Sequence, residues 1–186
     1  MAAATSLAEE PKFIEALIAR RAVLGALIVF SIIFVLVVLA QFVAPADPAA
    51  MSVRSRLAPP GADYPLGADA FGRDVLSRLL YAGQVSLAIG LGVALIASAV
   101  GIVIGLLAGF FRRLDGPMSR LIDAMMAFPD ILLAIALVAI LGGSMLNVVI
   151  ALSIVYAPRI ARIVRASTLV IRELPFVEAA NALGSS

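Results

Sequence analysis

The sequence of 186 residues contains no cysteine and no histidine. It therefore offers no thiolate nucleophile, no imidazole base, no disulfide scaffold and none of the zinc sites built from those ligands. Charged residues are also scarce, at 14% of the chain, whereas apolar residues make up 63%. Soluble domains have about 25% charged and about 45–50% apolar residues. The composition argues against a soluble enzyme and for a protein embedded in lipid.

The charge that is present does not indicate a nucleic-acid partner. The 14 Lys and Arg residues are nearly balanced by 12 Asp and Glu, which leaves a formal net charge of +2. Binding to nucleic acid would need basic residues clustered on an exposed surface. We therefore expect membrane lipid, and no nucleic acid, around this chain.

Long uncharged runs predict the membrane spans. The first, between Arg21 and Asp47, exceeds the roughly 20 residues needed to cross a hydrocarbon core. It predicts a span over 22–44 after a cytoplasmic segment, 1–21. A cleavable signal peptide is the alternative, but its apolar region would be only about 7–15 residues long and would follow a short basic start. The second run predicts a tilted span over 79–111.

The third run, 131–158, is interrupted by Gly142-Gly143-Ser144, a pattern typical of a turn. It could form one long helix or parts of a hairpin. Cytoplasmic loops carry an excess of Lys and Arg, and only four spans place the basic residues on both sides of this run in the cytoplasm. We therefore predict spans over 121–142 and 146–164, joined by an external turn, 143–145.

The remaining segments connect these spans. Segment 45–78 is rich in proline and glycine and predicts an irregular external loop. Residues 112–120 are expected to form a cytoplasmic loop, and 165–186 a cytoplasmic C-terminal segment. The predicted fold class is an all-α polytopic membrane protein with four transmembrane helices.

Small residues recur at every fourth position of the second span. Ala97, Gly101, Gly105 and Gly109 share one helix face, where they would let another helix approach closely. We interpret this face as a helix-packing surface, a role that says little about cargo.

The segment from Gly67 to Asp74 approaches the spacing of a phosphate-binding loop. Such a loop needs a lysine followed by a hydroxyl residue that holds Mg²⁺. Here Arg73 and the anionic Asp74 stand in those places. We therefore expect no nucleotide site in this chain.

Asp123 and Asp130 lie seven residues apart, which would place them on one face of the third span, with Arg120 one turn before Asp123. Carboxylates within a membrane can mark a proton pathway. Because both lie toward the cytoplasmic end and Pro129 can bend the helix, we favour an interfacial ion pair and a kink at helix entry.

The fourth span is followed by two unusual patterns. Arg159, Arg162 and Arg165 recur every third residue and are expected to hold topology and contact anionic lipid headgroups. Residues 172–184 form a polar stretch and a short Ala-rich segment that ends in Gly184, which is not typical of a membrane span.

Four blocks, residues 65–81, 120–129, 161–166 and 178–184, carry a further signal. In this order they resemble the second permease subunit of the dipeptide, oligopeptide and nickel group of ABC importers. The last block is similar to the EAA-x-x-x-G signature of importer permeases. The resemblance implies a type I importer permease fold that is truncated within the EAA segment and lacks the last two spans.

The resemblance also implies a function: a permease subunit of an ATP-driven importer for dipeptides, oligopeptides or a related solute. Its coupling residues would be Glu178, Ala179, Ala180 and Gly184, which would contact a separate ATPase that binds ATP and Mg²⁺. The implied partners are a homologous second permease, two ATPase subunits and a periplasmic or lipid-anchored solute-binding protein. The implied location is the bacterial cytoplasmic (inner) membrane, with a cytoplasmic N-terminus.

Two other functions remain open on the sequence. A proton-coupled secondary carrier would use Asp123 and Asp130, and a non-transporting fragment would keep only the helix-packing surfaces. None of these readings makes the chain itself an enzyme, and none places a catalytic residue, a metal or a cofactor in it.

Overall fold

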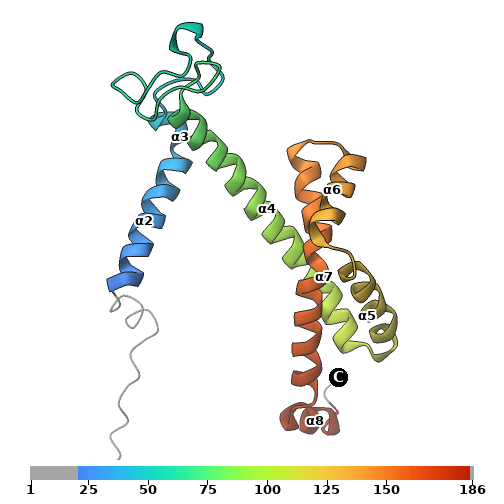
Figure 1. The fold of residues 1–186 in the computed structure, drawn as a ribbon. Coiled ribbons are helices and arrows are strands. Elements are labelled where there is room, and N and C mark those ends of the chain that lie inside the picture. Colours follow the sequence, from blue (N-terminus) through green and yellow to red (C-terminus); the bar gives the residue numbers. More distant parts are fainter. Residues whose placement is uncertain (1–20, 185–186) are drawn as a thin grey trace, which may run out of the picture. The chain divides into compact units, whose positions relative to one another are not determined.

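The computed structural model describes residues 21–184, and its regular elements are helices (Figure 1). The expected cytoplasmic segment 1–21 therefore lies, except for its last residue, outside the described residues. The chain divides into two compact units at Val85. The elements are α2 (Arg21–Val38), α3 (Ala40–Val43), the 3-10 helix η1 (Val53–Ser55), α4 (Val75–Phe110), α5 (Arg112–Met126), α6 (Asp130–Leu141), α7 (Met145–Arg172) and α8 (Pro175–Ala182).

Three helices, α2, α4 and α7, are long and apolar enough to cross a membrane. The pair α5 and α6 provides a fourth span if the two are counted as one segment bent by 90°. The predicted all-α membrane fold is confirmed. Whether it has three or four spans depends on this bent pair.

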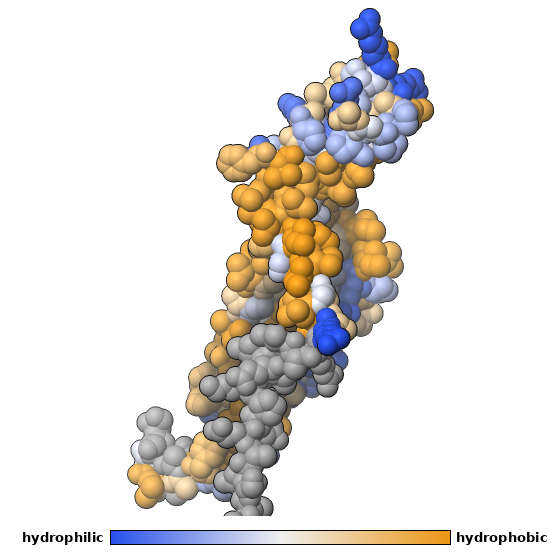
Figure 2. Space-filling view, turned by 90° about the vertical axis from the view of Figure 1, so that its left-hand side faces the viewer, coloured by the Kyte–Doolittle hydropathy of each residue, from blue (hydrophilic) through white to orange (hydrophobic). Residues whose placement is uncertain are grey.

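The first unit contains α2, α3, a long loop and the beginning of α4. Apolar side chains cover α2 with little burial, and Figure 2 shows this apolar surface below the more hydrophilic loop. Two contacts attach α2 to α4: a Cβ at Gly83 would lie 2.8 Å from a methyl group of Val37, and Gln84 Nε2 donates to the Val38 carbonyl at 3.2 Å. The exposed apolar side chains of α2 suit a lipid environment.

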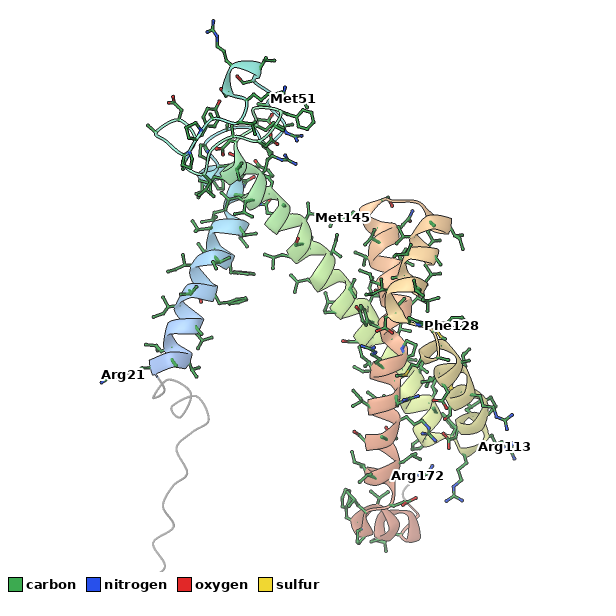
Figure 3. All side chains as sticks on the ribbon, viewed as in Figure 1. Arg21, Met51, Arg113, Phe128, Met145 and Arg172 are labelled. Carbon is green, nitrogen blue, oxygen red and sulfur yellow. The ribbon has the colours of Figure 1, made fainter. Side chains whose placement is uncertain are left out.

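The second unit is built around α7. Its buried side chains are mainly small or β-branched and come from α4, α5 and α7. Helices α5 and α6 pack on α7, and Ile122 supplies the buried contact of α5. Arg113 of α5 extends away from α7 (Figure 3). The helix α7 therefore contacts α4, α5 and α6.

The structure differs from the predicted boundaries in the third span. Residues 112–120, expected as a loop, are the beginning of α5, and the span expected over 121–142 is broken between Met126 and Asp130. Proline disfavours helical backbone in the residue before it, so Pro129 separates the two helices. The helix over 112–120 was missed because it is held by contacts with α7, far away in the sequence.

Two other boundaries also differ. Helix α4 begins at Val75 instead of residue 79, because the Asp74 side chain accepts a hydrogen bond from the Ser77 backbone N–H at 2.6 Å and caps the helix. Helix α7 continues to Arg172 instead of ending at residue 164. Its arginines find partners within the protein, so the helix need not end where the charges begin.

Candidate functional site

Three glycines of α4 lie directly against α7. A Cβ at Gly101 would be 2.8 Å from the carbonyl oxygen of Ala157, and one at Gly105 would be 2.6 Å from that of Ala161. A Cβ at Gly109 would lie 2.6 Å from the Cβ of Thr168. These glycines allow a backbone-to-backbone approach that no larger residue permits without displacement. The fourth predicted packing residue, Ala97, is 1% exposed on the same helix.

The end of α4 is also tied to α7 by a hydrogen bond. Arg172 Nη1 donates to the carbonyl oxygen of Gly109 at 3.0 Å. The last carbonyls of a helix lack partners within the helix, and a cation near them is favourable. Arg172 therefore fixes the C-terminal end of α4 to the C-terminal end of α7.

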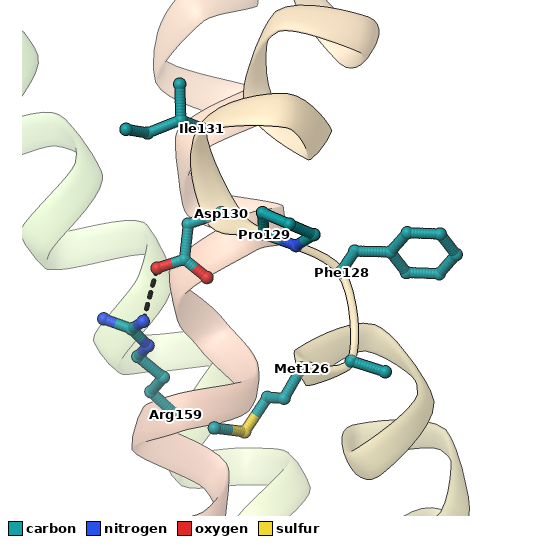
Figure 4. Close-up of a pocket in the computed structure, with 7 residues that line it drawn as sticks. Met126, Phe128, Pro129, Asp130, Ile131 and Arg159 are labelled. Atoms are coloured by element: carbon teal, nitrogen blue, oxygen red, sulfur yellow. Dashed lines mark ion pairs between the residues drawn. The ribbon is translucent and has the colours of Figure 1, made fainter.

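A cavity of about 480 Å³ lies at the break between α5 and α6. Figure 4 shows Phe128 pointing away from the pair formed by Asp130 and Arg159. The side chains that line the cavity combine apolar groups with one acid and one base: Met126, Ala127, Phe128, Pro129, Asp130, Ile131 and Arg159. A broken span with charges at the break is a common place for a transport site, because freed backbone groups and side chains can contact polar cargo there.

Asp130 and Arg159 form an ion pair across this cavity (Figure 4). The Arg159 guanidinium also lies 5.9 Å from the ring centroid of Tyr156, within the range of a cation–π contact. About half of the Arg159 side chain is exposed. The pair thus joins the first residue of α6 to the middle of α7.

Two further ion pairs join α5 to α7. Arg162 pairs with Asp123, and Arg165 Nε pairs with Asp115 Oδ1 at 2.5 Å. Ser119 Oγ donates to the same oxygen of Asp115 at 3.2 Å. We call the three pairs, Asp130–Arg159, Asp123–Arg162 and Asp115–Arg165, the aspartate–arginine ladder.

The ladder corrects two expectations. Asp123 pairs with Arg162 of α7 and not with Arg120 of its own helix. Asp123 and Asp130 do not share a face of one helix, because they lie on opposite sides of the break. The three arginines expected at lipid headgroups each pair with an aspartate. The expected kink at Pro129 is present, as a 90° bend.

The candidate coupling residues lie in and just after α8. Helix α8 begins at Pro175, three residues after the end of α7, and the Leu183 N–H donates to the Ala179 carbonyl at 3.1 Å. Ala179 is exposed, whereas the side chains of Glu178 and Ala180 lie outside the described residues. Gly184 has a φ of +87°, the left-handed conformation that commonly ends a helix.

Residues 101–186 match the family described as the binding-protein-dependent transport system inner membrane component. This region of the chain belongs to that family of membrane permeases. A relative from Brucella suis biovar 1, whose name describes a peptide transport system permease, is 47% identical over 170 residues, which is 91% of this chain and 57% of the relative. The dipeptide transport system permease protein of Alkalihalophilus pseudofirmus is 40% identical over 164 residues, 88% of this chain and 54% of the relative.

A glutathione transport system permease protein of Pectobacterium atrosepticum is 43% identical over 128 residues, which is 68% of this chain and 42% of that relative. The permease chain thus spans about half the length of the curated relatives it matches. The family match covers the C-terminal end of α4, from residue 101, and all of α5 to α8, and so includes the cavity and the ladder.

The loop of the permease between α3 and α4 is organised around Asp69. Its carboxylate accepts hydrogen bonds from the backbone N–H groups of Phe71 (2.8 Å) and Arg73 (3.0 Å) and from Arg73 Nε (2.9 Å). It also accepts one from Arg78. Burial raises the pKa of Asp69, but these hydrogen bonds outweigh it and hold the pKa well below its usual range.

Gly72 explains part of the motif that resembles a phosphate-binding loop. Its φ is +73°, and a Cβ there would overlap the carbonyl oxygen of Ser52. The glycine is therefore needed for a turn packed against another part of the same loop, which is a structural role. Arg73 and Asp74 stand where a phosphate-binding loop has its lysine and hydroxyl residue. Arg73 instead donates a hydrogen bond to the Asp69 carboxylate, and Asp74 caps the N-terminus of α4.

The ladder residues Asp115, Arg159, Arg162 and Arg165 were not recognised as partners from the sequence. A signal was present, since aspartates spaced by eight and seven residues precede arginines spaced by three. That pattern could not be interpreted without the bend, because a straight helix would place Asp115, Asp123 and Asp130 differently relative to α7.

Proposed function

We propose that this permease chain is a transmembrane subunit of an ATP-driven ABC importer for dipeptides, oligopeptides or a related solute. The proposal is supported by relatives whose names describe peptide, dipeptide and glutathione transport. It is also supported by three long apolar helices and by a bent helix pair that carries charges at its break.

The observation that carries the proposal is the position of α8. This short helix directly follows the long membrane helix α7, and its described side chains at Phe176 and Ala179 are exposed. Small residues on such a helix would permit close contact with another protein, and the left-handed Gly184 would permit a tight turn after it. We infer that α8 docks on a separate ATPase, with Glu178, Ala179, Ala180 and Gly184 as the contact residues.

The proposed assembly has further members. A homologous second permease would complete the translocation path, two ATPase subunits would bind ATP and Mg²⁺, and a periplasmic or lipid-anchored solute-binding protein would meet the loop before α4. The proposed orientation places α8 and α5 at the cytoplasmic side of the inner membrane, because arginines are retained there. Movement of α8 on ATPase closure would then reach the membrane helices as a rigid-body displacement.

Co-purification with the ATPase tests this function. We expect a tagged ATPase to retain the permease from detergent extracts, and we expect Glu178→Arg or Gly184→Trp to abolish that retention. Glu173→Arg and Gly143→Trp are matched controls, because both positions are exposed and no neighbouring atom lies within 4 Å of a Cβ at Gly143 or at Gly184.

Two results would contradict the proposal. One is retention that is unaffected by both α8 substitutions. The other is uptake into proteoliposomes driven by a pH gradient without an ATPase, which would indicate a proton-coupled carrier. The carboxylates such a carrier would use, Asp123 and Asp130, are paired here with Arg162 and Arg159.

A further inference from the structure

We propose that the aspartate–arginine ladder makes α5 and α6 move with α7, so that a displacement at α8 is delivered to the cavity at the break. This inference rests on the proposed function for its source of movement, and it adds the residues that transmit it. It assigns Asp115, Asp123 and Asp130, with their arginine partners, as positioning residues for transport.

The ladder supplies three ion pairs between the bent pair and α7, in addition to the hydrogen bond from Asn147 Nδ2 to the Leu141 carbonyl at the C-terminal end of α6. Its arginines recur every third residue on α7, and its aspartates are distributed over both sides of the break: two on α5 and one at the first residue of α6. The break itself is a proline-containing turn, which on its own would leave the angle between α5 and α6 adjustable. Three ion pairs to one continuous helix fix both arms to that helix.

The other side of α7 is held differently. The glycines of α4 contact Ala157, Ala161 and Thr168 of α7 and the backbone carbonyl of Arg165. The side chains of Arg159 and Arg162 lie on other faces of α7 at the helical repeat of 3.6 residues. Small-residue packing depends on shape and close approach, whereas the ladder depends on charge. Substitutions can therefore weaken one contact of α7 and leave the other in place.

The depth of the α7 arginines in the membrane favours ion pairing with aspartates over solvation of the charges by water. At 1.5 Å per residue, Arg159 lies about 21 Å and Arg165 about 30 Å along α7 from Met145. A hydrocarbon core is about 30 Å thick, so Arg159 falls within it if α7 begins at the external interface. A charge at that depth is costly unless it is paired. Separating α6 from α7 would leave Asp130 and Arg159 unpaired within the membrane, so their ion pair holds the two helices together.

One ion pair of the ladder also forms part of the cavity wall. Asp130 and Arg159 are a ladder pair and also line the cavity. Any movement of α7 carried by the ladder therefore displaces the whole cavity together with α5, α6 and α7. An ATPase movement that enters at α8 reaches the cavity through one helix and three ion pairs.

Spin-label distances in the assembled transporter test the proposal. The cysteine-free chain permits Ile140→Cys on α6 with Ile163→Cys on α7, which are 81% and 67% exposed. With the ladder intact, we expect a narrow distance distribution that does not change on addition of ATP. In the Asp123→Asn, Asp130→Asn double variant, we expect a broad distribution and transport reduced roughly tenfold while ATP hydrolysis continues, an effect within the usual range of coupling between sites.

Matched variants separate coupling from a loss of structure. Exchange of one pair, Arg162→Asp with Asp123→Arg, keeps an ion pair at that position with the charges reversed. This variant should therefore keep both the narrow distribution and transport. Arg120→Gln removes an exposed arginine of α5 outside the ladder and should change neither. The label pair Leu95→Cys and Ile163→Cys reports on α4 and α7 and should stay narrow in every ladder variant, which shows that the rest of the fold is retained.

The outcomes distinguish this inference from the proposed function. A distance between α6 and α7 that stays narrow without the ladder, or that changes with ATP when the ladder is intact, would overturn the inference. If no ATPase binds the chain, the proposed function fails, yet the dependence of the α6–α7 distance on the ladder is still measured in the absence of nucleotide.

Discussion

Asp74 shows how one side chain determines where a membrane helix begins. It is 2% exposed, and its Oδ2 accepts the hydrogen bond from the Ser77 N–H that caps α4. We predict that Asp74→Ala lowers the free energy of unfolding by about 1 kcal/mol, the usual cost of losing an N-cap. Asp74→Ser should retain most of the stability, because a serine hydroxyl can accept the same hydrogen bond.

Unfolding of the detergent-solubilised permease measures this difference, with Asp63→Ala as the control at an exposed position of the same loop. Equal losses for Asp74→Ala and Asp63→Ala would show that the cap contributes nothing. The second carboxylate oxygen of Asp74 is buried without a hydrogen-bond partner in the described part of the chain. Serine has no such oxygen, which is a second physical reason to expect the Asp74→Ser variant to retain most of the stability.

Asp69 gives the loop a defined dependence on pH. Its hydrogen bonds lower its pKa in the folded protein, so the carboxylate stabilises the fold above its unfolded pKa of about 3.9 and loses that contribution as the pH falls below it. We predict that the stability difference between the native chain and Asp69→Asn is constant between about pH 7 and pH 5 and shrinks below about pH 4. Paired unfolding curves across this range measure the difference. A difference that grows as the pH falls from pH 7 would contradict the assigned direction of the pKa shift, because the folded state would then bind the proton more readily than the unfolded state.

At the scale of helices, the small-residue face of α4 gives the sharpest contrast between two glycines. A Cβ at Gly105 would lie 2.6 Å from a carbonyl oxygen of α7, whereas one at Gly90 would have no neighbour within 4 Å. We predict that Gly105→Ala destabilises the protein by about 1–3 kcal/mol through overpacking. Gly90→Ala should stabilise it by up to about 1 kcal/mol, because alanine restricts the unfolded backbone. Thermal unfolding of the two variants in the same detergent checks both signs, and destabilisation by both would indicate a general intolerance of α4.

The helices were predictable where a local pattern decides and unpredictable where distant residues decide. Long uncharged runs predicted α2, α4 and α7, and the turn at Gly142 to Ser144 separates α6 from α7 as expected. The glycine spacing on α4 predicted a packing face. Helix α5 was missed because charged residues suggest a loop, and only the arginines of α7 reveal why those charges suit a helix there.

For the whole molecule, the number of spans follows from the path of the bent pair. If α5 and α6 together cross the membrane, the turn after α6 lies on the external side and α8 on the cytoplasmic side. If the pair enters and leaves on one side, that turn is cytoplasmic and α7 would carry α8 to the external side. The second arrangement would place the basic end of α7 outside, against the preference of Lys and Arg for the cytoplasm.

Cysteine accessibility distinguishes these arrangements in a chain that has no cysteine of its own. We predict that Gly143→Cys and Val53→Cys react with a membrane-impermeant maleimide in spheroplasts, whereas Arg113→Cys reacts only after permeabilisation. All three positions are exposed, Val53 to 93%, so a difference in labelling reports the side of the membrane and not burial. Because the Gly142 turn belongs to the same unit as α8, labelling at Gly143 also locates α8 on the opposite side of α7. Protection of Gly143→Cys together with labelling of Val53→Cys would establish the three-span arrangement, and with it an α8 that no cytoplasmic ATPase could reach.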